Sequence, residues 1–293
     1  MLVLKPHDKD LGGGFIVRRL LPSLQRQAVG PFLFFDHFGP VQVNPGRHHD
    51  VRPHPHIGLA TVTYLFEGAM LHRDSTGVVQ RIEPGAINWM TAGRGIVHSE
   101  RTPDDLLGRA WVSHGLQLWA ALPADDEEIE PAFSHTGAAA IPQLRAPGVL
   151  LRVLIGTAFG LRSPVPTRSP TLYLDLALDA GASIELPAAL ARERAVYAVD
   201  AEVEIDGRAV APQTLAVLDD GANVRVEAPR AAARAMLVGG EPLGHRFMWW
   251  NFVASRKERI AQAADEWAAQ PNAAFPRVSG DDEFIPLPER RPA

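Results

Sequence analysis

Four residues in two short segments, His54-Pro55-His56 and His98-Ser99-Glu100, have the types and spacing of metal ligands. In a β-strand, residues two apart point to the same face and lie about 7 Å apart, so each pair can present both side chains to one cavity. Imidazoles and a carboxylate, without thiolate, suit iron, manganese, nickel, copper or zinc and leave positions open on an octahedral ion. The pattern therefore predicts a reactive metal site rather than a structural one.

The overall composition is that of a globular protein with two domains. The chain has 293 residues, 46% of them hydrophobic and 22% charged, and a typical domain has about 150 residues. The net charge is -5 and there is no Lys/Arg-rich run, so we expect no direct binding of nucleic acid or of an anionic membrane. Binding to a DNA-bound protein is compatible with this charge.

The chain contains no cysteine, so disulfides and thiolate ligands are excluded. Its first residues lack the basic start and apolar core of a signal peptide. No window approaches the run of about 18 apolar residues that a membrane-spanning helix needs. We therefore expect a cytoplasmic protein that does not bind membranes.

Short alternating segments between Gly and Pro turns predict an all-β fold. Residues 61–66 alternate clearly, and a second set of such segments begins near Val149 and includes residues 171–178. Asp206-Gly207 is a dipeptide that favours a type I′ hairpin turn. Many short strands with frequent turns predict sandwiches or small barrels, and two sets of similar length suggest a duplicated barrel. The acidic and then Pro/Ala-rich residues 123–147 mark the expected boundary.

One helix is predicted near the C-terminus. Residues 255–258 form a capping-box pattern, and Pro271 ends the segment. Apolar residues at helical spacing lie between them: Ile260, Ala263, Ala264 and Trp267. The residues beyond are expected to be extended and to pack on the body. The three glycines at 12–14 are expected to form a turn, because they lack the phosphate-loop pattern.

The histidines are distributed unevenly. Seven of the eleven precede residue 75, three more lie by His135, and none falls between His135 and His245. The C-terminal domain therefore has no imidazole with which to repeat the N-terminal metal site. We expect a metal in the N-terminal domain only.

Five further histidines are assigned by their positions. His37 and His114 are expected near the cavity as hydrogen-bond partners, because liganding imidazoles usually donate their other N–H group. His48 and His49 lie beside Gly and Arg in an expected exposed loop. His72 is interpreted as a solvated hairpin residue.

Longer blocks around these motifs resemble the pirin family of the cupin superfamily. Residues 53–58 with 61–68 are similar to that family's first metal segment, and residues 89–100 to its second. Further blocks are residues 32–40, 114–119, 240–243, 249–253 and 255–260. The similarity extends over nearly the whole chain.

The resemblance implies a bicupin, that is, two antiparallel β-barrels of the double-stranded β-helix type, with a short C-terminal helix. The expected domains are residues 1–134, 147–242 without metal ligands, and a helix with an extended tail at 243–293. It also implies iron, with Fe2+ first and other divalent transition metals as alternatives. By position the metal ligands would be His54, His56, His98 and Glu100. Glu100 is also the expected catalytic base.

Two functions are compatible with this site. Family members are described as flavonol dioxygenases acting on quercetin, and in animals as iron-dependent nuclear co-regulators. We put first an iron-dependent dioxygenase that takes a small aromatic or enol substrate and dioxygen. The alternative is a metal- and redox-dependent regulatory protein that binds a protein partner and has no turnover. We expect a monomer in either case.

One position departs from the general cupin pattern. Cupins often place a liganding Glu four or five residues after the H-x-H motif, where this chain has Ala60 and Thr61. The carboxylate must then come from Glu100, and the pocket wall differs. Apolar residues near the motif that could form this wall are Trp89, Met90 and Leu118.

Overall fold

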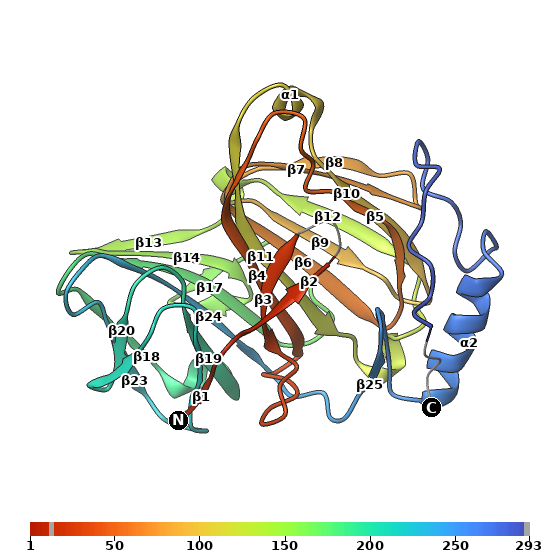
Figure 1. Cartoon of the computed structure of the whole chain (residues 1–293). Coiled ribbons are helices and arrows are strands. Elements are labelled where there is room, and N and C mark those ends of the chain that lie inside the picture. Colours follow the sequence, from red (N-terminus) through yellow and green to blue (C-terminus); the bar gives the residue numbers. More distant parts are fainter. Residues whose placement is uncertain (12–14, 290–293) are drawn as a thin grey trace. The chain divides into compact units, whose positions relative to one another are not determined.

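The structure is a computed structural model that describes residues 1–11 and 15–289 and consists mainly of antiparallel strands (Figure 1). The all-β prediction with a C-terminal helix is confirmed. The glycines at 12–14 lie outside the described residues. Within the described residues, no helix combines the length and the apolar character needed to span a membrane. Short helices occur at α1 (Asp104–Leu107), η1 (Ala124–Asp126), η2 (Ala138–Ala140) and η3 (Ala188–Leu190).

The chain divides into two compact units, each formed from three segments. Unit 1 comprises Met1–Lys9, Arg18–Asp36 and Ala139–Leu243, and unit 2 comprises Asp10–Val17, His37–Ala138 and Gly244–Ala293. The N-terminal strands thus contribute to both units, which a division by chain order does not anticipate. The boundaries expected at 134, 147 and 242 stay a prediction about independently folding domains.

Unit 2 is built on two antiparallel sheets. The four-stranded sheet has the order β5 (Val51–His56), β10 (Ile96–Arg101), β7 (Met70–Asp74), β8 (Val79–Ile82). The other sheet has the order β12 (Ala132–Thr136), β9 (Ile87–Thr91), β6 (Leu59–Glu67), β11 (Trp111–Ala121), β4 (Phe32–Val43), β3 (Ile16–Leu21), β2 (His7–Asp10). Strands β2, β3 and β4 contribute residues to both units. A small apolar cluster that includes Phe15, Phe38 and Leu65 packs within unit 2.

Unit 1 has a second pair of antiparallel sheets. Its larger sheet has the order β1 (Leu2–Leu4), β22 (Leu215–Val217), β19 (Glu193–Ala198), β24 (Ala233–Gly240), β17 (Thr171–Leu178), β14 (Val149–Ile155), β13 (Gln143–Ala146). The smaller has the order β18 (Ser183–Leu186), β23 (Val224–Glu227), β20 (Val203–Ile205), β21 (Arg208–Val210). A separate hairpin is formed by β15 (Thr157–Ala158) and β16 (Leu161–Arg162).

The core of unit 1 is aliphatic. The alternating residues Leu172, Leu174, Leu176 and Leu178 of β17 all belong to this buried cluster. The turn between β20 and β21 has Asp206 at φ 49° and Gly207 at φ 75°. Two consecutive positive φ angles define the type I′ hairpin, so the interpretation of Asp-Gly is confirmed.

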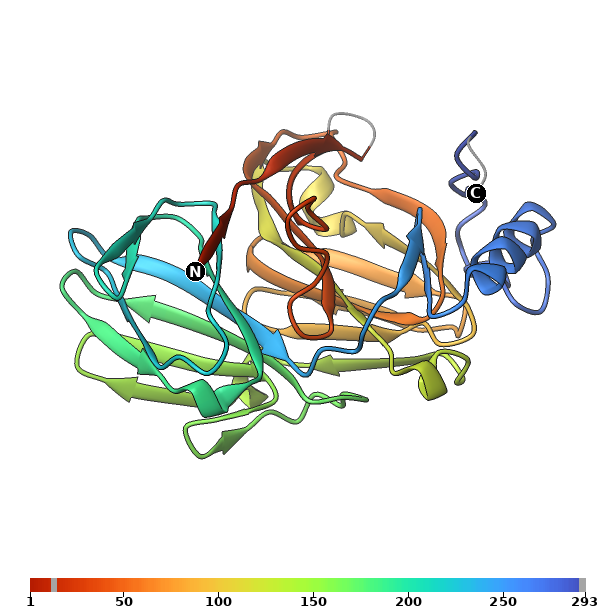
Figure 2. The same ribbon diagram turned by 90° about the horizontal axis from the view of Figure 1, so that it is seen from below.

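The predicted helix is present as α2 (Lys257–Ala268), beside the hairpin of β25 (Phe247–Trp249) and β26 (Phe252–Ala254) (Figure 2). Its apolar face, with Ile260 and Trp267, is buried. The capping-box prediction was wrong. The backbone N–H and the hydroxyl of Ser255 both donate to Glu127 Oε2, at 2.9 and 2.8 Å, so a distant carboxylate replaces the local cap.

The tail after α2 contacts the outside of the four-stranded sheet. Ile285 donates its backbone N–H to Pro53 O at 2.8 Å, and Trp267 donates its indole N–H to Ile285 O at 3.0 Å. Asp281 accepts hydrogen bonds from Ser99 and from the guanidinium of Arg101. The tail is therefore tied to β5 and β10.

Gly58, in the turn after β5, offers a test of how tightly this region is packed. Its φ is +67°, and an added Cβ would lie 2.0 Å from Val253 O. We expect Gly58→Ala to lower the free energy of unfolding by about 3 kcal/mol, because the positive φ and the clash both oppose it. Gly207→Ala is the matched control, since its φ is +75° with nothing within 4 Å. Urea unfolding that gave equal losses for both variants would contradict this packing.

Candidate metal centre

Pairing between β5 and β10 brings three imidazoles together. His98 lies directly opposite His54, and Ile96 lies opposite His56. Because alternate residues of a strand share a face, His54, His56 and His98 all point to the same side of the sheet. Their ligand atoms lie within 4.8 Å of one another. All three side chains are buried.

Backbone carbonyl groups determine which ring nitrogen of His54 and of His56 carries the proton. His54 Nδ1 lies 2.8 Å from Arg52 O, and His56 Nδ1 lies 3.2 Å from Asn251 O, in the β25–β26 turn. A carbonyl oxygen only accepts hydrogen bonds, so each Nδ1 carries the proton and each Nε2 presents a lone pair. Neither partner was foreseen from the sequence.

Burial keeps the three imidazoles neutral. It lowers the pKa of His54 to about 4, and it lowers the pKa values of His56 and His98 well below the usual value. Neutral imidazole is the form that binds metals. Moreover, His56 Nε2 and His98 Nε2 lie only 3.1 Å apart. The three histidines therefore fit a cation that would lie between their lone pairs.

Glu100 lies on the same face but outside this tight cluster. It follows His98 by two residues on β10, beyond a bulge in the pairing with β5, and it lies opposite His72 of β7. Among the described residues, the group whose ligand atoms all lie within 4.8 Å contains the three histidines without Glu100. Burial raises the pKa of Glu100 to about 7. Its role as fourth ligand stays a proposal.

His72 is buried, so its interpretation as a solvated hairpin residue was wrong. Only 5% of its surface is exposed. Its Nδ1 lies 3.4 Å from His98 Nδ1, and its Nε2 lies 2.9 Å from Asp74 Oδ2. The sequence does hold a signal for this contact, since His72-Arg73-Asp74 has the same two-residue spacing as the metal motifs.

The other assigned histidines lie elsewhere in unit 2. His37 Nε2 and His114 Nε2 lie 2.9 Å apart and the two rings stack, so these residues pair with each other. The partners of the clustered imidazoles are instead Arg52 O, Asn251 O and His72. His48 is exposed as expected, whereas His49 is half-buried against Phe15.

An aromatic residue, Trp119, lies beside the three histidines. The Trp119 ring lies 5.1 Å from the His56 ring in an edge-on arrangement. Thr61 of β6 pairs with both Trp119 and Met90, so Met90 shares the face of Trp119. Val62 pairs with Leu118 and Trp89 in the next row, which puts these two residues on the opposite face. Of the three expected wall residues, Met90 alone lies on the side of the histidines.

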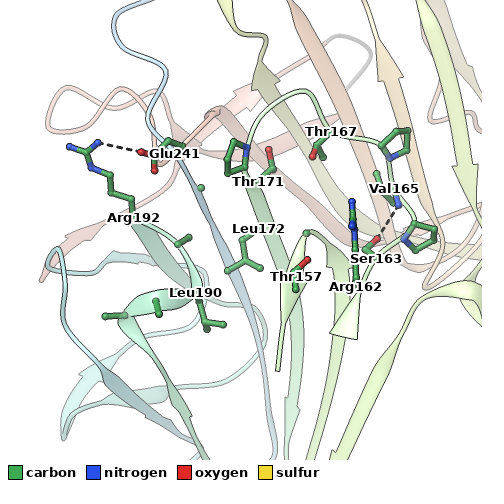
Figure 3. A pocket seen from close by; sticks show the side chains of 18 residues that line it. Thr157, Arg162, Ser163, Val165, Thr167, Thr171, Leu172, Leu190, Arg192 and Glu241 are labelled. Atoms are coloured by element: carbon green, nitrogen blue, oxygen red, sulfur yellow. Dashed lines mark hydrogen bonds and ion pairs between the residues drawn. The ribbon is translucent and has the colours of Figure 1, made fainter. Parts of the chain in front are cut away.

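Unit 1 has a cleft of a different character. Its volume is about 920 Å³, and its described lining contains hydroxyl and aliphatic groups but no histidine (Figure 3). The charged lining residues are Arg162, Arg192 and Glu241, and the last two form an ion pair at 3.3 Å. This donor set does not suit a transition metal. The absence of metal from this unit stays a prediction.

Comparison with known proteins identifies the family. The Pirin family model matches residues 14–120, and the model of the pirin C-terminal cupin domain matches residues 173–273. A pirin-like protein of Caulobacter vibrioides is 46% identical over 98% of this chain and 99% of its own length. Human pirin is 36% identical over 87% of each chain.

Comparison with a solved structure supports the same family. The crystal structure of quercetin 2,3-dioxygenase from Acinetobacter baumannii superposes with a TM-score of 0.88 at 33% identity, covering 99% of this chain and 97% of that chain. The fold is thus the bicupin that the resemblance implied. With both family models matched and close relatives over nearly its full length, the chain belongs to the pirin family.

Proposed function

We propose that the protein is a metal-dependent dioxygenase of the quercetin 2,3-dioxygenase type, which acts with Fe2+ and dioxygen on a flavonol or a related small enol. The observation that carries the proposal is the buried cluster of three neutral imidazoles. The similarity to a quercetin 2,3-dioxygenase over nearly the whole chain supports the reaction type. His54, His56 and His98 would hold the metal, with Glu100 as the fourth ligand.

If bound by these residues, a metal with open positions would supply Lewis acidity toward an enolate oxygen and reactivity toward dioxygen. The protein's own side chains would accept the proton that the substrate loses. In the metal-free protein, burial raises the pKa of Glu100 to about 7, so this carboxyl group binds a proton more tightly than an exposed one. In a flavonol this proton would come from the 3-hydroxyl group, which stands beside the 4-carbonyl oxygen. Glu100 is therefore proposed as the general base.

The aromatic wall fits a flat substrate. The rings of Trp119 and His56 are in a T-shaped arrangement, and Met90 lies on the same face as Trp119. Indole and thioether groups offer large, polarisable apolar surfaces that pack well against aromatic rings. We infer that these two residues contact the substrate rings.

The alternative function is a metal- and redox-dependent regulatory protein that binds a protein partner without turnover. The same four ligands would serve it, so oxygen consumption separates the two functions. A cytoplasmic location and a monomeric state remain predictions for either function.

Metal content tests the ligand set. We expect wild-type protein to bind about one Fe2+ per chain, and His56→Ala or Glu100→Ala to lose most of it, because each removes a donor. His48→Ala is the matched control, since its side chain is 53% exposed. Elemental analysis after anaerobic loading measures the outcome. Unchanged metal content in both ligand variants would refute the assignment.

Oxygen uptake tests the reaction. We expect Fe2+-loaded wild type to consume oxygen and open the ring of quercetin. Glu100→Gln, where it retains metal, should lower kcat by about 100-fold or more with a smaller change in KM, because a general base acts mainly in the transition state. Wild type that is fully loaded and yet inactive on every flavonol tested would favour the regulatory function.

Stability of the metal-free protein should depend on pH through Glu100. Its pKa is about 7 when folded and 4.5 when unfolded, so the folded state holds the proton more tightly. This contribution is fully present below pH 4.5 and is lost as the pH rises through about 7. Glu100→Gln should therefore gain up to about 3 kcal/mol over wild type between pH 4.5 and 7.5. Urea unfolding across this range checks the gain, and a pH-independent difference would speak against a buried, unpaired carboxyl.

A further inference from the structure

We propose that Asp74 and His72 are positioning residues that fix the tautomer of His98, so that His98 Nε2 presents its lone pair to the metal. The inference rests on the proposed metal site and adds two residues to it. They form a chain of hydrogen bonds that leads from a buried carboxylate to a proposed ligand.

Strand pairing places this chain beside the ligands. Asp74 lies directly opposite His98, on the other side of β10 from His54. His72 lies two residues before Asp74 on β7 and therefore points to the same face. Its Nε2 is 2.9 Å from Asp74 Oδ2, and its Nδ1 is 3.4 Å from His98 Nδ1.

The direction of each hydrogen bond follows from Asp74. Its Oδ1 accepts from Thr76 N at 2.9 Å, from Thr76 Oγ1 at 2.6 Å and from Val78 N at 3.2 Å. Oδ2 remains for His72, and a carboxylate only accepts. His72 Nε2 must then donate. We infer that this proton is the only one on the His72 ring, as a neighbouring metal cation would favour, so that its Nδ1 is an acceptor. His98 Nδ1 donates to it, and His98 Nε2 is left without a proton.

Burial and ring stacking stabilise this arrangement of hydrogen bonds. Asp74 is 1% exposed and His72 is 5% exposed, so water cannot readily replace either partner. The Phe133 ring stacks on His72 at 4.4 Å with an interplanar angle of 23°, which fixes the plane of the imidazole. Partners of this kind typically change metal affinity by about 10- to 100-fold.

His98 differs in this respect from the other two histidines. Backbone carbonyls fix the tautomers of His54 and His56, and no side-chain substitution can turn a carbonyl into a donor. The tautomer of His98 depends on side chains alone, namely His72 at Nδ1 and, in the metal-free protein, His56 at Nε2, 3.1 Å away. It can therefore be reversed by a nearly isosteric mutation.

Asp74→Asn is that mutation. The donors Thr76 and Val78 would keep the amide oxygen at the Oδ1 position, so the NH2 group would face His72 Nε2. His72 would then carry its proton on Nδ1 and donate to His98 Nδ1, which places the proton of His98 on Nε2. We expect nickel(II), as an air-stable probe, to bind about 10- to 100-fold more weakly, measured by isothermal titration calorimetry.

The matched control is Asp50→Asn. Asp50 Oδ1 accepts from Thr102 N and Thr102 Oγ1 at 2.7 and 2.8 Å, which resembles the turn of Asp74, but it lies outside the His72 chain. Its nickel(II) affinity should stay within about twofold of wild type. In His72→Ala the chain of hydrogen bonds is interrupted, so adding Asp74→Asn to this variant should cause no further loss of nickel(II) affinity. If the role of Asp74 were purely structural, Asp74→Asn would lower nickel(II) affinity equally in wild type and in His72→Ala.

Nitrogen-15 NMR of the imidazoles tests the tautomer directly in metal-free His56→Ala, which removes the second acceptor that lies 3.1 Å from His98 Nε2 in wild type. We expect His98 to be protonated on Nδ1 in His56→Ala and on Nε2 when Asp74→Asn is added to it. A His98 protonated on Nε2 in His56→Ala would overturn the proposal, as would an Asp74→Asn protein with unchanged nickel(II) affinity. If the tautomer reverses as expected but wild type binds no metal, the proposed function fails while the assignment of His72 and Asp74 stands.

Discussion

The register between β5 and β10 is the constraint on which the rest of the site depends. His98 lies opposite His54, and a slip of one residue would turn the imidazoles of one strand to the other face. Gly58 lies against Val253 O just beyond β5, and Asp281 binds Ser99 and Arg101 on the outer side of β10. These contacts surround the paired strands, so the described part of the C-terminal segment supports the geometry of the site.

Burial then determines the chemistry of the aligned groups. The imidazoles are neutral because desolvation disfavours their charged forms, and the same effect raises the pKa of Glu100 to about 7. With the tautomers proposed for His56 and His98, two unprotonated Nε2 atoms 3.1 Å apart repel each other, and the desolvation of the Glu100 carboxylate is also unfavourable. A cation would relieve both, so metal binding would also stabilise the fold of unit 2.

The sequence predicted features that depend on the spacing of residues along one strand or turn. It did not predict features that depend on contacts between segments distant in the chain. The period of two in H-x-H and H-x-E was enough to place three histidines on one face, and Asp206-Gly207 was enough for its hairpin. His72 was misread because its burial comes from the pairing of β7 with β10, which a strand pattern alone does not reveal. Ser255 was misread because Glu127, distant in the chain, competes for its hydroxyl.

The two units differ in the side chains that they bury on the inner faces of their sheets. Unit 1 fills the space between its sheets with aliphatic side chains such as Leu174, Val196 and Leu237, and each fully buried side chain of this kind contributes about 1.5–3 kcal/mol. Unit 2 gives one inner face to histidines and carboxylates, which must be hydrogen-bonded or paired with a cation to be tolerated there. The chain from Asp74 through His72 to His98 meets that requirement at one proposed ligand, so the same residues that make burial tolerable would also orient the lone pair.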